Sequence, residues 1–174
     1  SMSDIAAMGA VPTALLVGFG TPGSLELEWV DGLVAGLREE CGQVGAAVVG
    51  GDITAADVIT LAVSALGDLE GRDPVTLSGA RPGDVVAVSG RLGGAAAGLA
   101  VLGRGFRSPV HIVNAHRRPE PPYFEGPRAA QLGASAMTDV SDGLIADLGH
   151  IADASGVRIE LRAEAIEVAS KLTE

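Results

Sequence analysis

Short apolar runs separated by glycine and proline residues form the pattern of the first 75 residues. Two of these runs predict buried β-strands at residues 13–19 and 46–49. A strand-like run at residues 57–66 mixes both faces and predicts a third strand, in a sheet covered by helices on one side. Apolar residues at helical spacing predict a short helix over residues 4–8 and a longer one from an N-cap at Ser24 to about Cys41. The apolar face of the longer helix consists of Trp29, Val30, Leu33, Val34 and Leu37. The predicted order of elements is therefore α-β-α-β-β.

A second group of elements is predicted after the turn-rich segment 67–78, which we interpret as a linker. The expected strands are residues 84–89, 135–138 and 157–161, and the expected helices are 93–102, one or two turns at 128–132, 143–154 and a start at 164–172. Gly156 is expected to end the helix at 143–154. The four prolines between residues 104 and 122 predict an irregular segment. The whole pattern predicts an α/β (α+β) chain whose two groups of elements are residues 1–75 and 76–174.

The composition narrows the class of protein. Hydrophobic residues make up 47% of the chain and aromatic residues only 3%, so small aliphatic side chains must build the core. The net charge of −10 argues against a nucleic-acid-binding surface, but not against a nucleotide bound through a divalent metal. The single cysteine, Cys41, cannot form an internal disulfide. No apolar run approaches the ~20 residues that span a bilayer, and no signal peptide is recognisable, so we expect a cytoplasmic protein without a membrane partner.

The segment 136–150, AMTDVSDGLIADLGH, holds three short polar side chains in five residues, followed at once by a helical pattern. These residues are Asp139, Ser141 and Asp142. If a strand ends just before them, they lie at a strand-to-helix corner, where the first backbone N–H groups of the helix have no partner. The carboxylates can cap the helix, or they can hold a divalent cation that in turn holds phosphate oxygens. The pattern alone leaves both interpretations open.

A second polar group, in the sequence GGDIT, follows the predicted strand 46–49. Glycine lets the backbone approach a ligand closely, and the oxygens of Asp52 and Thr54 can ligate Mg²⁺. The alternative is a hairpin turn in which Asp52 bonds its own backbone.

The remaining candidate residues give weaker indications of a binding or catalytic site. The glycine-rich segment 89–94 has neither a Walker pattern nor a dinucleotide fingerprint, so we interpret it as a turn in which Gly94 and Gly98 permit close packing of helices. The three histidines lack metal-ligand spacing, and His150 is expected to pack or to lie at the surface. No serine has a base positioned next to it, so no nucleophilic triad can be recognised.

Taken together, five blocks resemble the thiamine-monophosphate kinase family, in the order that the family has. They are DIAAMGAVPTALLVG (4–18), GGDIT (50–54), SGARPGDVVAVSGRLGGAAAGL (78–99), RRPEPP (117–122) and AMTDVSDGLIADLGHIADASGV (136–157). The resemblance implies the two-domain architecture of aminoimidazole ribonucleotide synthetase-like proteins, here with an incomplete first domain. That first domain is expected to pair with its twin in a homodimer.

The same resemblance implies an ATP- and Mg²⁺-dependent transfer of the γ-phosphoryl group to thiamine monophosphate, which gives thiamine diphosphate by direct in-line transfer. In this chemistry the protein positions the substrates and metal ions neutralise the phosphate charge, so no catalytic nucleophile is needed. The resemblance implies that Gly51, Asp52 and Ser141 contact ATP. It also implies that Asp52, Asp139 and Asp142 ligate Mg²⁺.

The sequence departs from the family pattern in three places. The N-terminal glycine-rich segment with its aspartate cluster and the later glycine-glycine-acidic motif are missing, and Leu77 stands where many relatives carry an arginine. We therefore expect the 174-residue chain by itself to have weak or no kinase activity. Two alternatives stay open. One is a non-catalytic truncated dimeric module, and the other is a different ATP-dependent enzyme of the superfamily, such as selenophosphate synthetase. The second needs a reactive cysteine or selenocysteine near the missing N-terminus, for which a helical, buried Cys41 is poorly suited.

Overall fold

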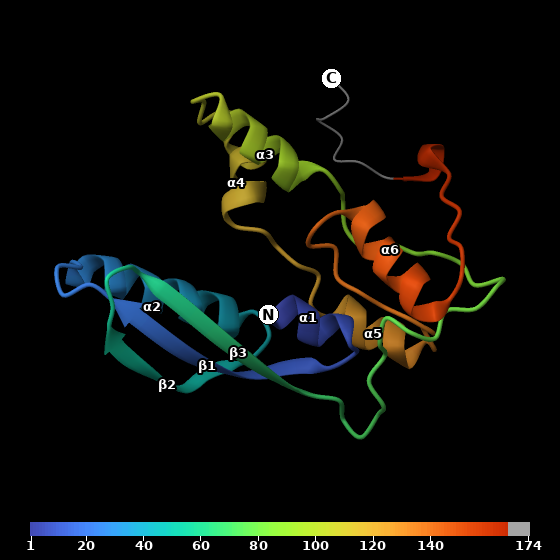
Figure 1. The fold of residues 1–174 in the computed structure, drawn as a ribbon, viewed down its shortest axis with the longest axis horizontal. Helices are drawn as coiled ribbons and strands as arrows, with labels where there is room; N and C mark the ends of the chain where they lie inside the picture. Colours follow the sequence, from blue (N-terminus) through green and yellow to red (C-terminus); the bar gives the residue numbers. More distant parts are fainter. Residues whose placement is uncertain (167–174) are drawn as a thin grey trace. The chain divides into compact units, whose positions relative to one another are not determined.

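The computed structural model of the chain describes residues 1–166, which fall into two compact units (Figure 1). Unit 1 consists of residues 1–76 and 123–139, and unit 2 of residues 77–122 and the described residues from 140 on. The domain division after residue 75 stays a prediction, and the compact units differ from it because residues 123–139 pack with unit 1. No helix among the described residues has the length and apolar composition needed to cross a membrane.

Unit 1 is built on a three-stranded sheet in the order β2-β1-β3 (Figure 1). The central strand, β1 (Val11–Thr21), pairs in parallel with β2 (Ala47–Ala55) and antiparallel with β3 (Thr60–Asp68). Helix α2 (Leu27–Gly42) connects the two parallel strands and packs on β2. Because β1 has a neighbour on each side, it carries the buried sheet residues Leu15 and Phe19. The predicted order α-β-α-β-β is confirmed.

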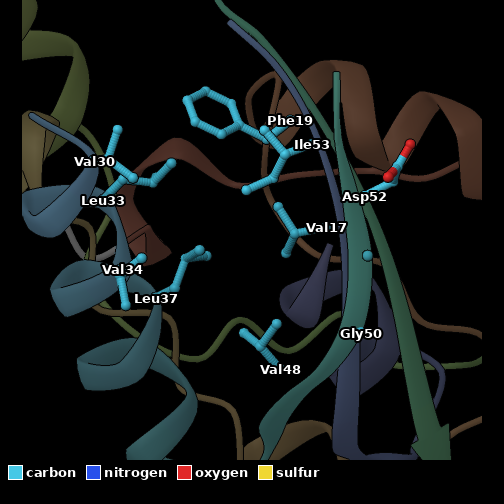
Figure 2. Close-up of a pocket in the computed structure, with 11 residues that line it drawn as sticks. Val17, Phe19, Val30, Leu33, Val34, Leu37, Val48, Gly50, Asp52 and Ile53 are labelled. Atoms are coloured by element: carbon cyan, nitrogen blue, oxygen red, sulfur yellow. The ribbon is translucent and has the colours of Figure 1, made fainter. Parts of the chain in front are cut away.

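Helix α2 has the predicted apolar face but not the predicted start. Its N-cap is Glu26, in an extended conformation and without a side-chain cap. The predicted cap at Ser24 is wrong, because a turn closed by the hydrogen bond from Leu25 N–H to Pro22 O (3.1 Å) precedes the helix. The apolar face is confirmed, since Val30, Leu33, Val34 and Leu37 project towards the sheet (Figure 2). The ring of Trp29 stacks on that of Phe19, with 6.0 Å between centroids.

Two short helices complete unit 1. They are α1 (Met2–Ala7) and α5 (Glu125–Gln131), which agree with the helical turns predicted near residues 4–8 and 128–132. Their backbones approach so closely that a side chain at Gly126 would overlap Ala6 O. Arg72 joins three segments of the unit, because its guanidinium donates to the carbonyl oxygens of Gly9, Leu69 and Pro127. Unit 1 has few aromatic side chains, and its helices and loops are held together in part by this close glycine contact and by the hydrogen bonds of Arg72.

A polar contact lies beside the small core of unit 1, which contains Met2, Ala6, Leu15, Cys41 and Tyr123. The Tyr123 hydroxyl donates to Glu40 Oε1 at 2.5 Å. Burial, the hydrogen bond to Glu40 and the Glu40 charge together raise the pKa of Tyr123. Burial, and then the Glu40 charge, raise the pKa of the Cys41 thiol. The expectation of a buried cysteine on a helix is confirmed, because Cys41 is 3% exposed.

We predict that stability depends on pH through Tyr123, the single tyrosine of the chain. Its pKa is raised on folding, so its contribution is fully present below the unfolded value of about 10 and is lost as pH rises above that value. Urea unfolding at increasing alkaline pH is expected to give a falling free energy of unfolding. Tyr123→Phe should flatten this dependence and cost about 1 kcal/mol at neutral pH. An equally steep alkaline loss in Tyr123→Phe would contradict the assignment.

The described residues of unit 2 are mainly helical. Its elements are α3 (Gly94–Gly103), α4 (Val110–Arg117), α6 (Leu144–Ser155) and the 3-10 turn η1 (Ala163–Ala165). Helices α3 and α4 pack closely, because a side chain at Gly98 would overlap Ile112 O. The packing predicted for Gly94 and Gly98 is therefore confirmed. Helix α4 was not predicted, because the prolines around it indicate breaks. Pro109 is the N-cap of this helix, and proline is tolerated at a helix start.

Three predicted strands are wrong in the described structure, namely residues 84–89, 135–138 and 157–161. An extended run becomes a strand only when a neighbouring strand satisfies its backbone groups. Val85 is 91% exposed, and in segment 135–138 the Met137 N–H donates to Thr76 O without a ladder. Helix α6 and its end at Gly156, in the left-handed conformation with φ 65, are confirmed. Residues 167–172 of the predicted helix 164–172 lie outside the described residues.

Candidate functional site

Asp52 lies inside a strand. The GGDIT residues continue β2 to Ala55, and Asp52 pairs with Gly18 of β1. The prediction that these residues follow the strand, and the alternative that they form a hairpin turn, are both wrong, because β1 offers pairing partners along the whole segment. Asp52 is exposed, and its carboxylate points away from α2 (Figure 2). The carboxylate is therefore available to a ligand on the other face of the sheet.

Gly51 has a structural reason to be glycine. The register of β1 with β2 shifts by one residue, so that Leu15 pairs with Val48 and Leu16 with Gly50. After this bulge Gly51 adopts φ 152, and a side chain there would overlap Val17 O. The group that Gly51 approaches closely is β1, whereas the sequence pattern suggested a ligand. A contact of Gly51 with ATP stays a prediction.

A pocket of about 380 Å³ lies between α2 and the sheet, within unit 1 (Figure 2). Its lining is aliphatic except for Phe19 and Asp52, and the Asp52 carboxylate points out of it. A triphosphate needs donors and metal-borne charge rather than aliphatic side chains. We therefore do not assign the nucleotide to this pocket.

A buried carboxylate organises the start of α6. Asp147 Oδ2 accepts the backbone N–H groups of Ser141 (3.0 Å), Asp142 (3.2 Å) and Gly143 (3.0 Å). Gly143 is the N-cap and provides no side-chain cap. The capping function considered for Asp139, Ser141 and Asp142 is thus performed by Asp147, and the side chains of Ser141 and Asp142 are exposed. Asp147 was missed because an aspartate within a helical pattern is usually taken as an exposed residue.

Asp142, Asp147 and His150 form a group, because one possible ligand atom from each lies within 4.8 Å of the others. The two carboxylates fit the preference of Mg²⁺ for oxygen ligands, whereas an imidazole nitrogen suits transition metals better. His150 is exposed, as one alternative of the sequence interpretation expected, but its position beside Asp142 was not predicted. The signal was present as the spacing of three residues between Asp147 and His150, which places both on one helix face.

The other end of α6 contacts a second block of the sequence resemblance, SGARPGD. Ser155 Oγ accepts the N–H groups of Gly79 and Ala80, both at 3.1 Å, and donates to Leu77 O at 3.0 Å. Within unit 2, side chains of a single helix therefore hold the backbones of both the SGARPGD and the DVSDGL blocks.

The sequence-predicted site residues are divided between the units. Gly51, Asp52 and Asp139 belong to unit 1, and Ser141 and Asp142 to unit 2. The structure of each unit taken alone does not show whether these residues bind the same ion or nucleotide, so their roles stay predictions.

Comparison with known proteins gives matches over most of the chain. The family described as "AIR synthase related protein, N-terminal domain" matches residues 1–69, and its C-terminal domain counterpart matches residues 81–174. A thiamine-monophosphate kinase from Mycobacterium tuberculosis is 50% identical over 164 residues, which cover 94% of this chain and 49% of that relative. The chain thus spans about half the length of this relative.

Two solved structures are similar in fold. "AaThiL complexed with AMPPCP and TMP" superposes with a TM-score of 0.92 at 34% identity, covering 99% of this chain and 56% of that one. Thiamine monophosphate kinase from Aquifex aeolicus superposes with a TM-score of 0.91 at 34% identity, covering 99% and 59%. The predicted resemblance and the predicted α/β architecture are confirmed.

Proposed function

Since the chain belongs to the AIR synthase related family, we propose that it supplies part of the nucleotide and metal site of a thiamine-monophosphate kinase. The observation that carries the proposal is the likeness to a solved complex with AMPPCP and TMP, together with 50% identity to a relative named for this activity. Because the chain spans about half of these relatives, the proposal concerns what its own residues contribute to the reaction. The proposed substrates are ATP and thiamine monophosphate, and the proposed location is the cytoplasm.

The proposed roles follow from the carboxylate and hydroxyl oxygens of the candidate residues, since Mg²⁺ prefers oxygen ligands. Asp52, Asp139 and Asp142 would hold Mg²⁺, which neutralises phosphate charge during in-line transfer. Gly51, Asp52 and Ser141 would contact ATP. These residues bind and orient, and none is assigned as a nucleophile. The exposed position of Asp142, with its backbone held by Asp147, supports its role, because the carboxylate is not used to cap α6.

Two alternatives make different predictions. A non-catalytic dimeric module would fold and assemble without Mg²⁺-dependent nucleotide chemistry. A selenophosphate synthetase-like reaction would need a reactive thiol, and Cys41 is a poor candidate because it is 3% exposed and its thiol pKa is raised.

We predict a homodimer in solution. Large apolar side chains on β2 and β3 are exposed, among them Val49 at 61%, Ile53 at 68% and Leu66 at 53%. Burial of such residues against a second copy would remove this surface from water. Light scattering is expected to give twice the chain mass at micromolar concentration. A monodisperse monomer would contradict the dimer and leave the nucleotide proposal unaffected.

Calorimetric titration with a non-hydrolysable ATP analogue tests the proposed function. Tight binding is expected when Mg²⁺ is present, and the affinity is expected to fall to a weak but measurable value when the metal is chelated. The isolated chain is expected to form thiamine diphosphate slowly or not at all, so binding rather than turnover is the readout. Absence of binding under both conditions would favour the non-catalytic module.

A further inference from the structure

Asp147 is a buried carboxylate to which the proposed reaction gives no role. It lies in the first turn of α6 and is 4% exposed. A single oxygen, Oδ2, accepts three backbone N–H groups. Hydrogen bonds to an ionised acceptor are about twice as strong as neutral ones, so this contact fixes the local backbone firmly.

The three donors belong to consecutive residues of the DVSDGL block. They are the backbone groups of Ser141, Asp142 and Gly143, and Gly143 has φ 130, a conformation that other residues rarely adopt. The chain therefore enters α6 along one path. Because only backbone groups are engaged, the side chains of Ser141 and Asp142 remain exposed and available to a ligand.

We propose that Asp147 is a positioning residue for the metal–nucleotide site. It holds the backbone of residues 141–143 so that the oxygens of Ser141 and Asp142 are presented in one geometry. Asp147 acts through these two residues by way of Oδ2, which accepts their backbone N–H groups, and it is not one of the proposed metal ligands. The inference rests on the proposed nucleotide site. Partners that orient a metal ligand are typically worth about 10- to 100-fold in metal affinity or activity.

Two substitutions and one control separate positioning from general stability. Asp147→Ala removes the acceptor, whereas Asp147→Asn keeps one oxygen that can accept. Asp153→Ala is the matched control, because it removes an exposed carboxylate from the same helix. For each variant, backbone amide exchange is measured by NMR at residues 141–143, and affinity for a non-hydrolysable ATP analogue is measured by calorimetry with and without Mg²⁺.

We expect Asp147→Ala to speed exchange at the three amides and to weaken the Mg²⁺-dependent affinity by about 10- to 100-fold. The loss without Mg²⁺ should be smaller, because only the Ser141 contact is then affected, and Asp147→Asn should restore part of the loss. Asp153→Ala should behave as the native chain. If Asp147→Ala does not fold, a loss of Mg²⁺-dependent affinity in folded Asp147→Asn supports the proposal, and native affinity in it overturns the proposal.

The outcomes also distinguish this inference from the proposed function. Native affinity in a folded Asp147→Ala protein, or equal losses with and without Mg²⁺, would overturn the positioning role alone. A native chain that binds no nucleotide would overturn both proposals. Unchanged amide exchange at residues 141–143 in Asp147→Ala would overturn the positioning role whatever the nucleotide result.

Discussion

Replacing Gly51 by alanine is expected to lower the free energy of unfolding of unit 1 by about 3–4 kcal/mol. The added Cβ would overlap Val17 O on the neighbouring strand, and φ 152 is unfavourable for alanine. Relief requires β2 to separate from β1 beyond the bulge, which breaks the hydrogen bonds of that ladder. This is a large share of the total stability of a domain of ordinary size.

Urea unfolding followed by Trp29 fluorescence measures this effect. Trp29 is the only tryptophan and lies on α2, stacked on Phe19, so its signal reports unit 1. Gly36→Ala is the matched control, because Gly36 lies in α2 with open space around it and alanine there should stabilise by about 0.5–1 kcal/mol. A shift below 1 kcal/mol for Gly51→Ala would show that the strand pairing around residue 51 is wrong.

Asp142→Asn is expected to weaken Mg²⁺-dependent nucleotide binding by about 100-fold. The substitution keeps the shape of the side chain but removes the charge that attracts a cation. The free energy of unfolding should change by less than about 0.5 kcal/mol. The Asp142 side chain is exposed, and its backbone N–H still donates to Asp147 in the variant. Calorimetry in the presence and absence of Mg²⁺ gives both affinities.

The matched control for this prediction is Asp153→Asn, which removes the same charge from an exposed position in α6. A similar loss in both variants would indicate a general effect of net charge, and Asp142 would not be a metal ligand. Native affinity in Asp142→Asn would have the same consequence.

The elements of unit 1 could be predicted because each segment carries its own signal. Residues 13–19 are apolar and bounded by turns, and the spacing of Leu33, Val34 and Leu37 fits one helix face. The extent of β2 could not be predicted. Two glycines usually indicate a turn, and only the pairing with β1 shows that Gly50 and Gly51 continue the strand.

Tertiary contacts explain the remaining differences. The segment 84–89 has the composition of a strand, but no described segment pairs with it. In the candidate site, the sequence names candidate ligands whose roles stay predictions, but it did not indicate Asp147, whose Oδ2 accepts the backbone N–H groups of residues 141–143. Asp147 resembles any helical aspartate in the sequence, and its role depends on burial and on three backbone donors that only the folded chain brings together.

Phosphoryl transfer by a chimera tests the central claim most directly. In it this chain replaces the matching segment of the thiamine-monophosphate kinase from Mycobacterium tuberculosis, which supplies the rest of the length. With ATP, Mg²⁺ and thiamine monophosphate, the chimera is predicted to form thiamine diphosphate at a rate comparable to that of the relative, and its Asp142→Asn variant is predicted to form almost none. A folded chimera that binds the ATP analogue but leaves thiamine monophosphate unchanged would contradict the account.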